Sequence, residues 1–162
     1  MVFFYYFRVA NLILQLSFDF FSSTYPDLPL YLTTQRSPKT SKSSFLKQEF
    51  MIAHYPHQDK EKFLIPNITN FQDGLKVGEA LFKKVKTPFC IYANGDDIAA
   101  GIIKVAKHNQ KVLHRDFFIL GEDNLAYSDL LNFNTVDFHL KTVAKQAVNL
   151  LLSEKQGQTS GL

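Results

Sequence analysis

The amino-acid sequence predicts an α/β fold in which a parallel sheet carries helices on both of its faces. Short apolar runs alternate with longer amphipathic segments along the 162 residues, as expected when parallel strands are joined by crossover helices. The run at residues 89–93 (FCIYA) is apolar without a break, which is typical of a strand buried on both faces. No repeat or linker interrupts the pattern, so we predict one domain over residues 1–162.

The first element is a helix at residues 8–21, where aliphatic side chains recur at helical spacing. A membrane span is not expected, because Arg8 and Asp19 enclose only ten uncharged residues and a span needs about 20. The chain's start also lacks the basic region and the small-residue cleavage site of a signal peptide. The predicted location is therefore the cytoplasm.

A short strand and a second helix follow. A Tyr-Pro-Asp sequence breaks the first helix, and residues 28–34 (LPLYLTT) form a buried strand. A polar loop at residues 35–44 comes next. Thr40 or Ser41 at its end can cap a weaker helix over residues 43–54, because hydroxyl oxygens accept the free N–H groups of a first helical turn.

The middle of the chain repeats the strand-and-helix unit. After a loop that contains Pro and charged residues, residues 63–66 (FLIP) form a strand. Asn70 can cap the helix predicted over residues 71–86, which carries its aliphatic side chains on one side. The buried strand at residues 89–93 follows it directly.

The turn after that strand leads into another helix. Asp96 or Asp97 can cap this helix, which we predict over residues 97–108, and acids at a helix start are also favoured by the helix dipole. The next strand is predicted at residues 116–120 (DFFIL), and a Gly-Glu-Asp-Asn turn ends it. Beyond the turn, the pattern continues to the carboxyl end.

Three elements complete the prediction. A short helical piece covers residues 127–132, a strand covers 133–136, and a helix covers about 138–153, before a polar tail. Five strands and the helices between them are therefore expected, all belonging to one sheet.

Charge and cysteine content restrict the classes of partner. The formal net charge is +3, and no run of five or six basic residues occurs, so these residues carry no nucleic-acid footprint. Any DNA contact would have to come from a segment outside them. Cys90 is the only cysteine, which excludes an intrachain disulfide, and its apolar neighbours predict a buried, inert thiol.

Polar clusters fall where the predicted strands end. They occupy the loop after Thr34, the loop after Pro66, residues 94–97 and residues 122–124. Ligands of open α/β sheets bind beyond the carboxyl ends of the strands, so these side chains are expected to converge on one rim. Carboxylates and amides accept hydrogen bonds from vicinal hydroxyls, which makes sugars and nucleosides plausible ligands.

An enzyme is the less favoured alternative. Asp96, Asp97 and Asp123 could hold Mg²⁺, since hard cations prefer oxygen ligands, although capping alone explains the first two acids. The five histidines show no spacing typical of a metal site, and no phosphate-binding loop or serine-nucleophile motif is present. We therefore predict no catalytic residue, no metal and no cofactor.

Two segments, considered together, resemble the lac-repressor family of transcriptional regulators. Residues 88–101 are similar to its strand–turn–helix "P-x-A-x-x-x-x-N/G-D-x-x-A-x-G", and residues 116–124 are similar to its "P-x-D-x-x-x-x-G-Y/F-D-D/N". The matching positions are Pro88, Gly95, Asp96, Ala99, Gly101, Asp116, Gly121, Asp123 and Asn124. The resemblance extends over about residues 60–158, with Gly74 matching a glycine of the family's preceding helix.

The resemblance implies a periplasmic-binding-protein-like type I fold and a small effector, usually a sugar or a purine. It places Asp123 and Gly95 in contact with the effector, and Asn94 and Asp96 lie on the same turn as Gly95. An aromatic residue of the family often lines the pocket where this chain has Thr69, and Phe71 could take its place. These residues and Ser41 are the predicted ligand site.

Ser41 marks a departure from the family pattern. The family carries an arginine in "R-x-x-G-F" that grips the effector's hydroxyls, and this chain has Ser41 at the arginine and Ser44 at the glycine. Neither Arg36 nor Lys42 is at the matching position. The resemblance therefore implies altered recognition, because a lysine offers a point charge without the paired geometry of a guanidinium.

The resemblance also implies a piece of a larger regulator. Residues 28–158 correspond to the carboxy-terminal lobe, residues 1–27 to a helix left over from the preceding lobe or to irregular chain, and no DNA-binding domain is included. Homodimerisation would use the helix at 97–108 and the piece at 127–132. The predicted function is effector sensing and dimerisation, with a solute-binding receptor of the same fold as a second hypothesis that would require an export signal.

Overall fold

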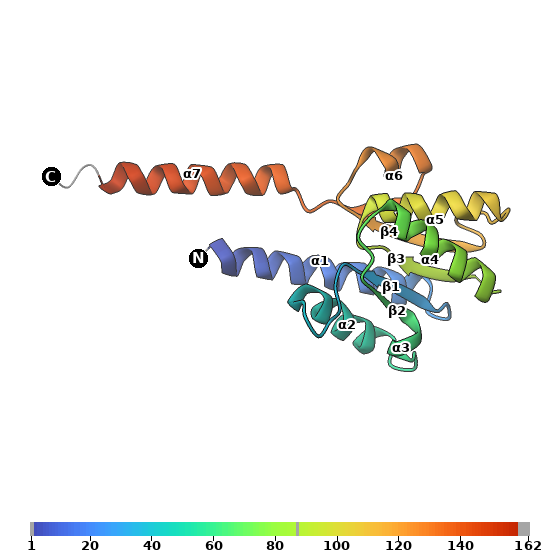
Figure 1. Cartoon of the computed structure of the whole chain (residues 1–162). Coiled ribbons are helices and arrows are strands. Elements are labelled where there is room, and N and C mark those ends of the chain that lie inside the picture. The colour runs from blue at the N-terminus through green and yellow to red at the C-terminus, as the bar shows by residue number, and fades with distance from the viewer. Residues whose placement is uncertain (1, 87, 159–162) are drawn as a thin grey trace.

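The computed structural model describes residues 2–86 and 88–158, and its centre is a parallel sheet (Figure 1). Five strands lie in the order β2-β1-β3-β4-β5, and every neighbouring pair is parallel. Their bounds are Leu30–Thr34 (β1), Leu64–Pro66 (β2), Phe89–Tyr92 (β3), Phe117–Glu122 (β4) and Asn134–Val136 (β5). The prediction of a parallel α/β sheet is confirmed.

Helices cover both faces of the sheet. Helices α1 (Val2–Thr24) and α2 (Lys42–His54) contribute to the core on one face, and α4 (Phe71–Lys84) and α5 (Asp96–His108) contribute to the core on the other. Two short helices, α3 (Lys60–Phe63) and α6 (Ala126–Leu131), lie in connections. The last helix, α7 (Leu140–Gln158), extends away from the sheet in Figure 1.

Helices α4 and α5 approach each other closely because glycines lie where their backbones meet. A Cβ on Gly101 would lie 2.5 Å from the backbone oxygen of Phe71, and a Cβ on Gly74 would overlap the backbone oxygen of Ile98. Real Cβ atoms essentially never come so close to backbone atoms. The two glycines thus allow α4 to pack directly on α5, whose apolar side chains fill the core against β3 and β4.

The opposite face is filled by aromatic side chains. Phe18 and Phe21 of α1 are fully buried, and their ring centroids lie 5.6 and 6.3 Å from the ring centroid of Tyr92 on β3. Cys90 is also buried on this face, and burial raises the pKa of its thiol to about 12. The thiol therefore stays protonated at neutral pH, which agrees with the predicted inert cysteine.

Helix α3 and the bounds of strand β4 differ from the sequence prediction. Residues 60–63 form α3 where the end of a loop and, at Phe63, the start of a strand are predicted, because the Asp59 carboxylate accepts the backbone N–H of Glu61 at 3.1 Å and starts a helical turn. Strand β4 begins one residue later and ends two residues later than predicted. Asp116 lies outside it, where its carboxylate accepts the backbone N–H of Val112 at 2.7 Å, and Glu122 pairs with Val136 of β5.

The start of α5 also differs. Helix α5 begins at Asp96, its N-cap is Gly95, and no side chain caps it. The prediction that Asp96 or Asp97 caps this helix is wrong, because the Asp96 carboxylate turns toward other segments. By contrast, the predicted caps of α2 and α4 are present, since Ser41 accepts from the backbone N–H of Ser44 and Asn70 accepts from that of Asp73.

The carboxyl end is more helical than predicted. Helix α7 continues through Gln158, where a helix ending near residue 153 and a polar tail are predicted. The remainder of that tail lies outside the described residues. Within the described ranges, no helix combines the length and apolar character needed to cross a membrane.

Candidate functional site

The strand register brings the ends of β1, β3 and β4 to one edge of the sheet. Leu32 pairs with Tyr92, and Tyr92 pairs with Leu120, so the residues that follow them meet at this edge. A cavity of about 100 Å³ opens there. The strand ends contribute Thr34, Gln35, Asn94 and Glu122 to its lining, and the first half of α2 contributes Ser43, Ser44 and Lys47.

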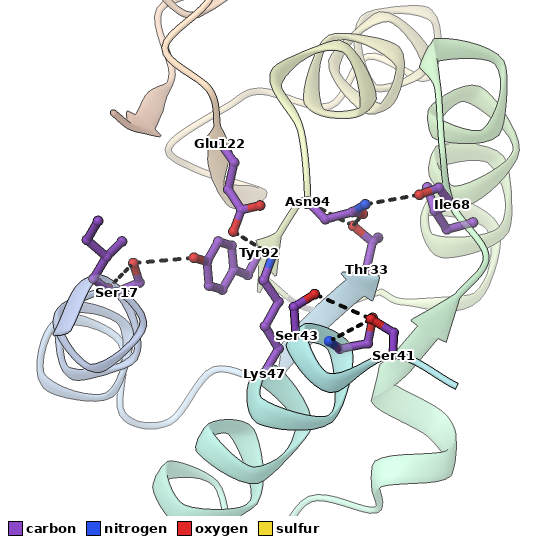
Figure 2. A network of polar contacts seen from close by, with 11 residues as sticks. Ser17, Thr33, Ser41, Ser43, Lys47, Ile68, Tyr92, Asn94 and Glu122 are labelled. Atoms are coloured by element: carbon purple, nitrogen blue, oxygen red, sulfur yellow. Dashed lines mark hydrogen bonds and ion pairs between the residues drawn. The ribbon is translucent and has the colours of Figure 1, made fainter. Parts of the chain in front are cut away.

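A buried ion pair borders this cavity. Lys47 Nζ lies 2.5 Å from Glu122 Oε1 (Figure 2), and only 9% and 6% of the two residues' surfaces remain exposed. The ammonium also lies 5.1 Å from the centre of the Tyr92 ring. Loss of one partner would leave an uncompensated buried charge, which costs about 3–5 kcal/mol in typical proteins.

Polar contacts continue from this pair toward α1. The Tyr92 hydroxyl donates to Ser17 Oγ at 3.5 Å, and the Ser17 hydroxyl donates to the backbone oxygen of Ile13 at 2.9 Å (Figure 2). Burial and the neighbouring Glu122 carboxylate raise the pKa of Tyr92 well above its usual value. The phenol therefore stays neutral, and it links the cavity border to the helix on the same face.

Asn94 joins the end of β1 and the loop after β2 to the loop after β3. Its side-chain oxygen accepts from the Thr33 hydroxyl at 2.5 Å, and its Nδ2 donates to the backbone oxygen of Ile68 at 3.0 Å (Figure 2). Its backbone N–H donates to Thr33 Oγ at 3.0 Å. Asn94 thus lines the cavity, and it also holds the end of β1, the loop after β2 and its own loop after β3 together.

Ser41 lies at the amino end of α2, beside the cavity. Its Oγ accepts the backbone N–H of Ser44 at 3.4 Å and lies 3.4 Å from the Ser43 hydroxyl (Figure 2). Ser43 and Ser44 line the cavity directly. The position where the family resemblance implies a guanidinium is therefore occupied by a short hydroxyl that caps the helix.

Asp96 is fully buried and both of its oxygens are engaged. The backbone N–H of Leu125 donates to Oδ2 at 2.7 Å, and the Thr135 hydroxyl donates to Oδ1 at 2.6 Å. Burial raises the pKa of this carboxyl, and the two hydrogen bonds act in the opposite direction. The carboxylate joins the start of α5 to the segment before α6 and to β5.

The carboxylates of Asp97 and Asp123 both lie close to Gly95. A Cβ on Gly95 would lie 2.8 Å from Asp97 Oδ1 and 3.9 Å from Asp123 Oδ2. Asp123 has a φ of 96°, a conformation that is uncommon for a residue other than glycine. Burial raises the pKa of Asp123, the neighbouring Glu122, Asp96 and Asp97 carboxylates raise it further, and Lys47 lowers it.

Thr69 and Phe71 do not line the cavity. The backbone N–H and the hydroxyl of Thr69 both donate to Asp73 Oδ2, at 3.1 and 3.0 Å, as part of the start of α4. Phe71 lies under Lys104 of α5, with Nζ 5.6 Å from the ring centre. The structure therefore places Asn94 in the cavity lining and Ser41 beside it, with Gly95 and Asp96 at the start of α5 and Asp123 directly after β4. Thr69 lies just before α4, and Phe71 lies at the α4–α5 contact.

The predicted ligand site includes neither Lys47 nor Glu122, although Glu122 belongs to the polar cluster that the sequence places after the fourth strand. One signal was present, because Ser44, Lys47 and Met51 are the buried residues of α2 and share one side of the helix. A lysine on the buried side of a helix requires a partner. For Glu122 the signal was weaker, since the predicted strand ended at residue 120. Within the described part of the chain, no three His, Cys, Asp or Glu side chains are grouped as a metal site would need.

Comparison by sequence finds transcriptional regulators of Bacillus subtilis. Catabolite control protein B is 30% identical over 96 residues, which are 59% of this chain and 30% of that protein. The NTD biosynthesis operon regulator NtdR is 25% identical over 123 residues, which are 74% of this chain and 36% of that protein. No family model matches the sequence. The chain spans about a third of the length of these curated relatives.

Comparison by structure finds LacI-family regulators. A LacI family transcriptional regulator from Lactobacillus casei with bound glucose has a TM-score of 0.77 at 17% identity, over 89% of this chain and 56% of that one. A LacI family regulator from Enterococcus faecium with bound ribose has a TM-score of 0.69 at 17% identity, over 88% and 53% of the two chains. These similarities confirm the predicted periplasmic-binding-protein-like fold.

Proposed function

We propose that this chain, a relative of the LacI-type transcriptional regulators, forms the effector-sensing lobe of such a regulator. Both the sequence relatives and the fold support this assignment. Within the chain, we assign residues 28–158 to the carboxy-terminal lobe. Helix α1 lies outside that range, but it packs on the same sheet as α2, and we therefore add it to this lobe.

The polar cavity at the strand ends carries the proposal. Its lining combines hydroxyls, amides, an ammonium and a carboxylate, so it offers both donors and acceptors to a hydroxylated ligand. Asp123 follows Glu122 directly and lies on the same rim. Two structural neighbours contain glucose and ribose. We therefore propose that the effector is a sugar or a similar small polar metabolite, with Asp123 as an acceptor of its hydroxyl hydrogen bonds.

The proposal includes partners. Regulators of this type act on DNA, and we assign that contact to a segment outside these 162 residues, because the net charge of +3 is modest and spread along the chain. We assign homodimerisation to the face formed by α5 and α6, where Leu125, Tyr127 and Leu130 are exposed. We also propose a cytoplasmic location, because a regulator of this type acts on DNA and a chain with a single cysteine forms no intrachain disulfide. The sequence relatives are regulators, and we propose no enzymatic activity.

A binding measurement with a matched variant tests the effector site. We expect at least one of glucose, ribose and sucrose to raise the melting temperature of the chain. Asp123→Ala should weaken that ligand's Kd by roughly tenfold or more, because a hydrogen bond to a charged group contributes about 1.5–3 kcal/mol.

Asp27→Ala is the control for this measurement. Asp27 is an exposed acid before β1 that does not line the cavity, so its removal should leave the Kd unchanged. Equal affinities of the parent and Asp123→Ala would refute the proposed role of Asp123. Failure of the parent to bind any of the three sugars would refute the sugar-sensing function.

A further inference from the structure

The Lys47–Glu122 pair borders the cavity, and the proposed function does not yet use it. Both side chains line the cavity, and both residues are more than nine-tenths buried. They come from different layers, since Lys47 lies on α2 and Glu122 lies at the end of β4. A charged pair in this position is costly to bury, which suggests a role beyond holding two elements together.

Both members of the pair retain hydrogen-bonding capacity. An ammonium group has three N–H donors and an ionised carboxylate has about four acceptor sites. Their mutual contact joins Nζ to Oε1, which uses one donor and one acceptor. The cavity therefore meets a donor and an acceptor that lie next to each other and are held in fixed positions.

The charge of the pair restricts what it can bind. The ammonium and the carboxylate neutralise each other, so the cavity border carries no net charge from them. An anionic ligand would be placed against Glu122 and near Asp123, whereas a cationic ligand would be placed against Lys47. A neutral ligand with two adjacent hydroxyls avoids both conflicts, because one hydroxyl can accept from Lys47 while its neighbour donates to Glu122.

Ser41 makes this arrangement relevant to specificity. Its short hydroxyl caps α2 and supplies no paired donors at the cavity border. Lys47, two turns further along the same helix, provides a cation at the cavity in this chain. We propose that Lys47 and Glu122 together bind a vicinal diol of a neutral effector and thereby determine which hydroxylated ligand the site accepts. This inference rests on the proposed function, because it assigns the pair to the same effector cavity.

The competing explanation is that the pair has a structural role alone, and conservative variants distinguish this role from ligand binding. Glu122→Gln keeps an oxygen that accepts from Lys47 but removes the carboxylate charge. The double variant Lys47→Met with Glu122→Gln removes both charges and leaves no buried ion without a partner. Circular dichroism and thermal unfolding verify that each variant is folded. Glu49→Gln, at an exposed position of the same helix, is the matched control.

The decisive measurement is the energetic coupling between a ligand hydroxyl and the Lys47–Glu122 pair. Kd is measured for the sugar of the panel that binds the parent most tightly, and for its deoxy derivatives that each lack one hydroxyl. We expect Glu122→Gln to weaken binding of the complete sugar by roughly tenfold. For the parent, removal of one particular sugar hydroxyl should weaken binding by a similar factor. For the double variant, removal of the same hydroxyl should change the Kd little, because the groups that this hydroxyl contacts are already absent.

Two results would overturn the inference. If folded Glu122→Gln binds the sugar as tightly as the parent and Glu49→Gln do, the pair does not contact the ligand. If every deoxy derivative loses the same factor in the parent and in the double variant, the pair and the ligand hydroxyls are independent. In both cases, weaker sugar binding by Asp123→Ala than by the parent would leave the proposed function intact. If the parent binds none of the sugars, both proposals are refuted.

Discussion

Asp96 shows how one buried carboxylate organises the rim. It accepts hydrogen bonds from Leu125 and Thr135 and is fully shielded from solvent. Burial alone disfavours its charge, which raises the pKa, and the two hydrogen bonds offset part of that cost. Although the sequence marks Asp96 as a candidate for ligand contact, its engaged oxygens support a positioning role, and we propose that role in place of direct contact.

We predict that Asp96→Ala lowers the free energy of unfolding by about 1–3 kcal/mol, because the Leu125 N–H and the Thr135 hydroxyl lose their acceptor. Urea unfolding followed by circular dichroism measures the change. Asp97→Ala is the matched control, since within the described part of the chain Asp97 accepts from the adjacent Ile98 N–H alone, and its effect should be smaller. Equal stability of Asp96→Ala and the parent would contradict the positioning role.

At the scale of elements, the contact between α4 and α5 depends on backbone proximity. Gly101 faces the backbone of Phe71, and Gly74 faces the backbone of Ile98. Because backbone atoms cannot turn aside as a flexible side chain can, a new methyl group would force the helices apart. The same movement would disturb the core that α5 forms against β3 and β4.

Gly101→Ala should therefore lower stability by about 1–3 kcal/mol, the usual cost of forcing an extra methyl into a packed interior. The gain in helix propensity from glycine to alanine, about 1 kcal/mol, offsets only part of this. Gly78→Ala is the comparison, because its Cβ would meet no atom nearer than Val105 Cβ at 3.0 Å, a longer approach than the 2.5 Å at Gly101. A melting temperature of Gly101→Ala at or above that of Gly78→Ala would show that the close approach is not limiting.

The elements that can be predicted from sequence are those with local causes. Ser41 and Asn70 cap their helices through backbone N–H groups three residues onward, and the continuous apolar run of β3 needs no partner to be recognised. Asp96 and Thr135 are 39 residues apart, and Lys47 and Glu122 are 75 residues apart. Their pairing exists only once the strands align, so no local pattern can predict it.

At the scale of the whole molecule, α7 is separate from the sheet. It extends away from the other elements in Figure 1, and Leu140, Val148, Leu150 and Leu152 are all about half exposed or more. Apolar side chains that stay exposed contribute little to folding free energy, because they bury no surface. Among the residues whose burial the structure describes, the cores on the two faces of the sheet contain none from α7.

Ending the chain after His139 should therefore leave the stability of the remaining domain nearly unchanged. We expect a melting temperature within about 4 °C of that of the parent, since a change of about 1 kcal/mol in unfolding free energy corresponds to some 2–8 °C in domains of this size. Thermal unfolding followed by circular dichroism tests this, with the loss of helical signal from α7 as the sign of truncation. Phe133→Ala provides the contrast, because Phe133 belongs to the buried core and its truncation should cost about 3–5 kcal/mol. A fall in melting temperature on truncation comparable with that of Phe133→Ala would mean that α7 packs on the domain and is not separate from it.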